Sequence, residues 1–149
     1  MSQETVILLG HVSGRKSIER LLAEFGWALE SATTMGGLTR IGSRSDVVAV
    51  LIDAAALGLP WKRALAAVRR EAPHALPVLC HPFSDPIEWT EASAEGAFHL
   101  LGLPLNLSEL RQSLGFVWAE RNQRANKVVA LDSGDRSRLR KDRARGHVA

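Results

Sequence analysis

The sequence predicts an α/β fold, a doubly wound parallel sheet between two layers of helices. Apolar runs of strand length alternate with segments of helical periodicity along residues 5–120. The run DVVAVLID at 46–53 is apolar on consecutive positions, which is typical of a central strand buried on both faces. Parallel strands need crossover connections, and these are right-handed, so the alternation favours a three-layer α/β/α arrangement with five strands.

The first half of the chain contains three of these strands. TVILLG at 5–10 is the first, and it precedes a helix that ends at Gly26. ALESATT at 28–34 predicts a weak strand, and MGGLTRIGS at 35–43 predicts a poor helix because glycine lowers helix propensity. DVVAVLID is the third and strongest strand.

The second half predicts two strands and three helices. Helical periodicity in WKRALAAVRREA at 61–72 is followed by the apolar strand ALPVLC at 75–80. A helix in SDPIEWTEASAEG at 84–96 then leads to the fifth strand, AFHLLGL at 97–103. The last helix is predicted from about 106 to about 124, because Leu residues recur there at helical spacing.

Capping residues place the ends of the last two helices. Ser84 or Asp85 is the predicted N-cap of the first of them, and Gly96 lies at its far end. Asn106 and Glu109 have the spacing of a capping box, with Asn in the place of Ser or Thr.

Composition is that of an ordinary globular chain of 149 residues, 46% hydrophobic and 23% charged. A single cysteine, Cys80, excludes an internal disulfide framework. The N-terminus lacks the pattern of a signal peptide, and no window approaches the roughly 18 apolar residues of a membrane span. We therefore expect a cytoplasmic protein that makes no membrane contact.

Charge is distributed unevenly along the chain. From Arg121 onward there are nine Lys and Arg against three Asp, whereas the preceding residues carry a net negative charge. We expect one domain over residues 1–122 and a solvated, disordered basic tail over 123–149. The tail is also the alternative site for nucleic acid, a weak one because it has no aromatic residues to stack on bases.

Ligands of doubly wound sheets bind beyond the carboxyl ends of the strands. Asp53 ends the third strand, Gly10 and His11 follow the first, and His81 and Pro82 follow the fourth. An ionised carboxylate at the end of such an apolar run needs a partner, so Asp53 is expected to reach a crevice at this edge of the sheet.

Residues 5–120 resemble the receiver domain of two-component response regulators. The similarity lies in the apolar strand that leads into the first helix, in VLID, and above all in the passage from the fifth strand into the last helix. The positions that match this passage are Gly96, Ala97, Pro104, Leu105 and Leu110. The resemblance implies a flavodoxin-like sheet with strand order 2-1-3-4-5.

The receiver chemistry that this resemblance implies is mostly missing. The family places an acidic pair for Mg²⁺, a phosphorylated aspartate, a Ser or Thr, a lysine and a strand-five aromatic residue around the crevice. Asp53 alone matches. The positions of the others hold Gly10 and His11, His81 or Pro82, Leu103 and Leu100. The chain therefore resembles a degenerate receiver, a pseudo-receiver, in which Asp53 is a vestigial phosphoacceptor.

Electrostatics predicts that phosphotransfer to Asp53 is slow or absent. Mg²⁺ prefers several oxygen ligands, and one carboxylate beside a glycine and an imidazole is a poor site, so we expect no cofactor and weak or absent Mg²⁺ binding. The alternatives are a conventional receiver still phosphorylated at Asp53, or a carboxylate held by backbone amides, His11 or His81.

Two enzyme interpretations use the same crevice. His11, Asp53 and His81 give a two-histidine, one-carboxylate set for a metal ion, although nothing in their spacing requires it. GHVSGRKS, from Gly10 to Ser17, has the spacing of the phosphate-binding loop of a nucleotide hydrolase, but Arg15 stands where that motif needs glycine. The ordinary interpretation places Arg15 and Lys16 in the exposed first turn of a helix.

If the crevice at Asp53 carries out no phosphotransfer, the function must lie on the protein surface. Receivers use the face made by the fourth helix, fifth strand and fifth helix, where this chain has Trp89, Leu100 and Trp118. Large aromatic residues dominate interface energetics, although core packing is the competing interpretation. We expect a protein-interaction module without enzymatic activity, which binds a signalling protein or a second copy of itself.

Overall fold

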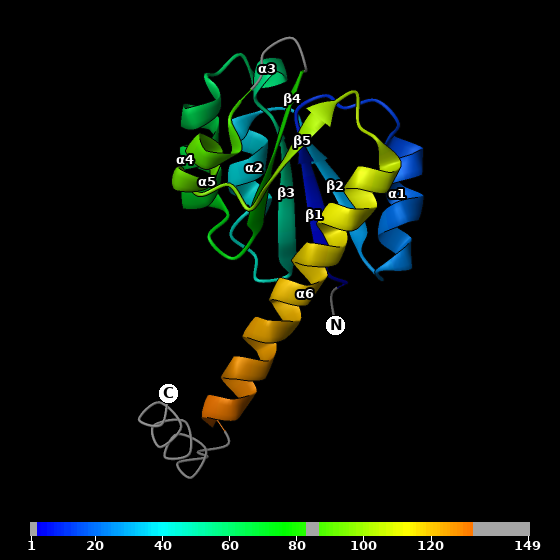
Figure 1. The fold of residues 1–149 in the computed structure, drawn as a ribbon, viewed down its shortest axis with the longest axis vertical. Coiled ribbons are helices and arrows are strands. Elements are labelled where there is room, and N and C mark those ends of the chain that lie inside the picture. Colours follow the sequence, from blue (N-terminus) through cyan, green and yellow to red (C-terminus); the bar gives the residue numbers. More distant parts are fainter. Residues whose placement is uncertain (1–2, 83–86, 133–149) are drawn as a thin grey trace. The chain divides into compact units, whose positions relative to one another are not determined.

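The structure is a computed structural model, and it describes residues 3–82 and 87–132 (Figure 1). The chain divides into two compact units, Met1–Val117 and Trp118–Ala149. The first unit holds one sheet of five parallel strands in the order β2-β1-β3-β4-β5. This confirms the predicted doubly wound parallel sheet and its 2-1-3-4-5 order.

The strands lie close to their predicted positions. They are β1 (Thr5–Leu9), β2 (Ala28–Ala32), β3 (Val47–Asp53), β4 (Leu76–Pro82) and β5 (His99–Leu103). The helices are α1 (Arg15–Glu24), α2 (Met35–Ile41), α3 (Ala54–Leu57), α4 (Trp61–Glu71), α5 (Trp89–Ala94) and α6 (Leu107–Asp132). β3 is buried along its whole length, as expected for a central strand.

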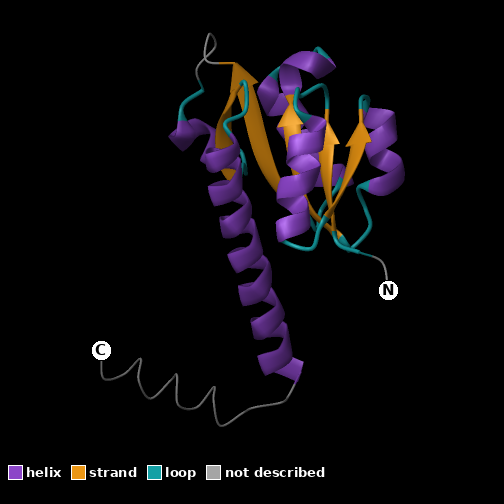
Figure 2. Cartoon of the chain, turned by 90° about the vertical axis from the view of Figure 1, so that its right-hand side faces the viewer, coloured by secondary structure: helices purple, strands orange, loops and turns teal. Residues whose placement is uncertain are grey.

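The sheet separates two apolar cores, because alternate side chains of each strand point to opposite faces. Val6 and Leu8 of β1 belong to the core that α1 and the first part of α6 cover. Ile7 and Leu9 belong to the core that α2, α3, α4 and α5 cover. Figure 2 shows the sheet between these layers of helices.

Three elements differ from the sequence prediction. α3 was not predicted, because four residues are too few to show a helical period. α5 begins at Trp89, later than predicted, and the expected cap residues Ser84 and Asp85 lie outside the described residues. α6 continues to Asp132, so the predicted end near 124 is wrong and the start of the predicted tail is helical. Residues 133–149 lie outside the described part.

The last helix begins as predicted. The Asn106 side chain accepts a hydrogen bond from the backbone N–H of Glu109 at 3.1 Å, which is the expected cap. Leu110, Leu114 and Val117 of α6 are completely buried in the first core. No helix in the described ranges is long and apolar enough to cross a membrane.

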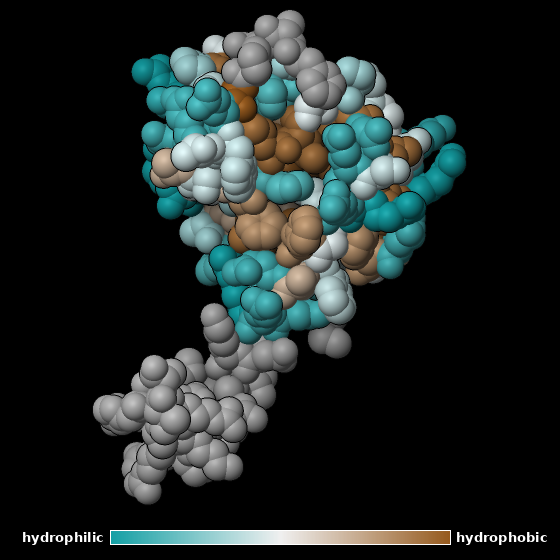
Figure 3. Space-filling view, viewed as in Figure 1, coloured by the Kyte–Doolittle hydropathy of each residue, from teal (hydrophilic) through white to brown (hydrophobic). Residues whose placement is uncertain are grey.

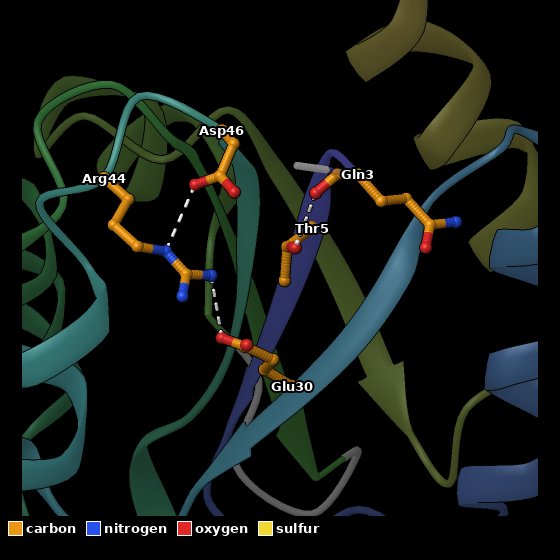
Figure 4. A network of polar contacts seen from close by, with 5 residues as sticks. All are labelled: Gln3, Thr5, Glu30, Arg44 and Asp46. Carbon is orange, nitrogen blue, oxygen red and sulfur yellow. Dashed lines mark hydrogen bonds and ion pairs between the residues drawn. The ribbon is translucent and has the colours of Figure 1, made fainter. Parts of the chain in front are cut away.

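The two edge strands of the sheet differ in chemistry. Near the outer strand β2, the Arg44 guanidinium pairs with Glu30 at 2.9 Å and with Asp46 at 3.1 Å (Figure 4). Arg15 reaches the Ser31 hydroxyl of the same strand at 2.6 Å. β5, at the opposite edge, has the sequence HLLGL and carries no ionised carboxylate, lysine or arginine.

Candidate functional site

The Asp53 carboxylate is the cap of a short helix. It lies at the end of β3, is only 5% exposed, and its Oδ1 accepts a hydrogen bond from the Ala56 N–H at 3.3 Å. Ala56 belongs to α3, whose first N–H groups have no partner within the helix. A backbone amide therefore satisfies the carboxylate, which was one of the alternatives that the sequence left open.

Gly10 packs directly against Asp53. Its φ is +112°, a conformation that L side chains rarely adopt. A Cβ atom at this position would lie 2.8 Å from the Asp53 Cβ and 3.0 Å from the Asp53 carbonyl oxygen. The Asp53 Cβ and carbonyl oxygen therefore lie where the first atom of a side chain at position 10 would be, so the acidic side chain that the receiver resemblance places here does not fit this conformation.

The two histidines do not complete a metal site. His11 is exposed in the loop after β1. His81 is half-buried within β4, not beyond its end as predicted, and its Nδ1 lies 3.1 Å from the Pro82 carbonyl oxygen. In the described ranges, no three His, Cys, Asp or Glu side chains are grouped so that they could hold a metal ion. The proposed ligand set of His11, Asp53 and His81 is therefore not assembled.

The segment from Gly10 to Ser17 adopts the ordinary arrangement. α1 begins at Arg15, directly after Gly14 with its φ of +85°. The exposed Arg15 side chain bonds Glu19 at 2.9 Å as well as Ser31, so it lies along the helix and toward β2. These contacts confirm Arg15 and Lys16 as the exposed first turn of a helix, and they leave the phosphate-loop interpretation without support.

Apolar residues occupy the other crevice positions. Leu103 packs against the first core, together with Val12 and Leu105. Pro82 is the register partner of Leu103 in the sheet, and Leu100 packs against the second core. The structure thus places aliphatic carbon where the resemblance implies a lysine, a hydroxyl group and an aromatic ring.

A second candidate site lies on the face made by α5, β5 and α6. Trp89 is 47% exposed and Phe116 is 48% exposed. His99 lies between them, with ring centroids 6.3 Å from Trp89 and 5.9 Å from Phe116, both in edge-on contact. We call these three residues the aromatic face. Figure 3 shows apolar surface over β5 between α5 and α6.

The sequence identified this face only in part. The exposure of Trp89 excludes plain core packing for it, and Leu100 is half-buried and packs against the second core. Trp118 is 50% exposed and belongs to the second unit. Phe116 and His99 were missed. The available signal for Phe116 was its position beside the stripe of Leu110, Leu114 and Val117, where a helix turns away from its core.

Comparison with solved structures decides the fold. A response regulator receiver domain protein from Clostridium thermocellum superposes with a TM-score of 0.65 at 19% sequence identity, covering 80% of this chain and 97% of that one. The fold is that of a receiver domain. A CheY-like receiver domain protein from Methanospirillum hungatei gives a TM-score of 0.66 at 17% identity, covering 83% and 99% of the two chains.

A structure that is not described as a receiver also superposes on this chain. A structure described as adenylate cyclase from Rhodopirellula baltica has a TM-score of 0.67 at 16% identity, and it covers 88% of this chain and 98% of that one. No family model and no curated protein sequence matches the chain. At these identities, the superpositions show the receiver fold alone.

Proposed function

We propose that this chain is a receiver-like interaction module in signal transduction, without enzymatic activity, that works without phosphorylation of Asp53. The close approach of Gly10 to Asp53 carries the proposal. A phosphoacceptor needs open space and Mg²⁺ ligands beside its carboxylate. Here position 10 holds a glycine, and a side chain there would collide with the Asp53 Cβ and carbonyl oxygen.

The charge around Asp53 supports the same conclusion. A phosphoryl group brings about two negative charges, which receivers offset with a metal ion and a lysine. Leu103 stands at the implied lysine position and packs against apolar carbon. We therefore propose that Mg²⁺ binding is weak or absent and that no cofactor is used.

The aromatic face is the proposed contact surface. Its exposed rings, Trp89 and Phe116, are the side-chain types that most often carry interface energy. The proposed partner is a signalling protein or a second copy of this chain.

Phosphorylation can be tested with a small phosphodonor. The chain is incubated with acetyl phosphate and Mg²⁺ and analysed by intact-protein mass spectrometry, with a conventional receiver as the positive control. We expect no phosphoryl adduct on this chain. A Mg²⁺-dependent adduct that disappears in Asp53→Asn would contradict the proposal.

The contact surface is tested by self-association. We expect Trp89→Ala and Phe116→Ala each to weaken the dimer about 30-fold, since truncation of an aromatic anchor costs about 2 kcal/mol. Sedimentation velocity over a concentration series measures the change, and Arg20→Ala on the exposed side of α1 is the control. Equal association constants for all four proteins would show that the contact lies elsewhere. If the wild type stays monomeric, the second copy is excluded as the partner.

A further inference from the structure

His99 has an unsatisfied polar atom in the middle of the aromatic face. The ring is half-buried on β5, between Trp89 and Phe116. Its Nδ1 is buried and has no hydrogen-bond partner in the part of the chain that the structure describes. Buried polar atoms are almost always paired, so an orphaned ring nitrogen needs an explanation.

α6 carries a second buried polar group without a partner. The Ser113 hydroxyl is completely buried and also lacks a partner among the described residues. Glu109, Ser113 and Phe116 follow one another at helical spacing along one stripe of α6. Phe116 contacts the His99 ring, and the Glu109 carboxylate acts on its charge. Ser113 therefore lies on α6 between two residues that interact with His99.

We propose that His99 is a proton-dependent switch of the aromatic face. The neutral ring holds Trp89 and Phe116 in edge-on contact. The protonated ring must place an N–H on Nδ1, where the present arrangement offers no acceptor. The ring then turns toward α6 and donates to the Ser113 hydroxyl and the Glu109 carboxylate, which separates it from Trp89.

The charges around His99 set the direction of the switch. Burial lowers the pKa of His99 below its ordinary value of 6.5, and the Glu109 carboxylate on α6 opposes this shift. On β4, the register partner of His99 is Val78, which does not titrate. α5 carries the exposed Glu91, which pairs with Lys62 at 2.6 Å, and the exposed Glu88 and Glu95 flank this helix as its cap residues.

The sign of the pH dependence follows from the lowered pKa. The unfolded chain binds a proton at His99 near pH 6.5, whereas the native state binds it only at lower pH. The contribution of neutral His99 to stability is therefore complete above pH 6.5. It is lost as the pH falls through the native pKa, and the present ring arrangement is lost with it.

NMR spectroscopy of the full chain tests the switch directly. Imidazole ¹⁵N signals report the pKa of each histidine between pH 5 and 8, and the Trp89 indole signal reports the ring contact. We expect His99 to titrate below 6.5 and the Trp89 signal to move with it. In His99→Gln the Trp89 signal is expected to be independent of pH. His74→Gln, at an exposed position, is the control, and in this variant the Trp89 signal is expected to change with pH as it does in the wild type.

Two further variants separate the switch from a merely buried histidine. Ser113→Ala removes an acceptor of the protonated ring, and Glu109→Gln removes the negative charge that favours it, so each is expected to move the pKa of His99 further down. Circular dichroism first confirms that both variants fold. Unchanged titration of His99 in both, or titration without movement of the Trp89 signal, would overturn the proposal.

The effect on partner binding rests on the proposed function, whereas the ring movement does not. Self-association of the wild type is expected to weaken as the pH falls from 7.5 through the native pKa of His99 that NMR measures, and in His99→Gln it is expected to stay constant. If Trp89→Ala abolishes association but a change of pH does not affect it, the proposed contact stands and the switch is overturned. A monomeric wild type that shows the NMR transition would instead exclude self-association and support the switch.

Discussion

Replacing Gly10 by Asp is expected to lower the free energy of unfolding by about 2–4 kcal/mol. The substitution restores the residue type that the receiver resemblance places here. Its Cβ would nevertheless meet Asp53 at 2.8 Å, on a backbone whose φ is +112°. Urea denaturation followed by circular dichroism measures the loss. We also expect Mg²⁺ to give the variant no additional stability.

A matched pair of alanine variants separates strain from close approach. Gly14 also has a positive φ, +85°, but a Cβ there would meet nothing within 4 Å. Gly14→Ala is therefore expected to lose only the conformational part, about 1 kcal/mol, and Gly10→Ala clearly more. Equal losses in the two variants, or Mg²⁺-dependent stabilisation of Gly10→Asp, would show that the crevice is open.

The Cys80 thiol is expected to react with a maleimide or disulfide reagent at least about 1,000-fold more slowly at pH 8 than an ordinary thiol. Burial raises the pKa of Cys80 from 9.0 to about 12, and the Asp53 charge in the neighbouring strand adds to the shift. Each pKa unit lowers the reactive thiolate about tenfold. Because the chain has one cysteine, the labelling rate reports this site alone.

The labelling rate in denaturant is the control, since it must return to that of a free thiol. Native labelling within tenfold of that rate would mean that β4 is not packed as described.

The raised pKa of Cys80 also has a consequence for the stability of the fold. The unfolded chain releases the thiol proton near pH 9 and the native state does not, so this contribution is complete below pH 9 and is lost as the pH rises through about 12.

The fold could be predicted from the sequence because strand burial, helical periodicity and helix capping depend on residues close together in the chain. The alternation of buried runs and helical stripes located all five strands, and the cap at Asn106 located the start of α6. α3 is too short for a period, and its existence depends on the Asp53 side chain that caps it. The end of α6 was misplaced because polar composition was taken to indicate disorder.

The candidate site could be predicted only in part because it depends on contacts between distant segments. The position of Asp53 at a strand end followed from its apolar neighbours. The close approach of Gly10 to Asp53 depends on how the loop after β1 packs against the end of β3, and no local sequence pattern encodes this contact. Likewise, Trp89, His99 and Phe116 come from three elements, and only the folded chain shows that their rings meet.

The unequal edges of the sheet limit how copies of this protein could join by strand addition. A strand approaching β2 meets the ion pair of Glu30 with Arg44 and the Arg15 side chain on Ser31, and charged edges of this kind deter pairing. β5 has no such barrier. Once two copies had paired through their β5 strands, only the charged β2 edges would remain free, and no further copy would be added. Strand addition would therefore give a closed dimer and not a fibre.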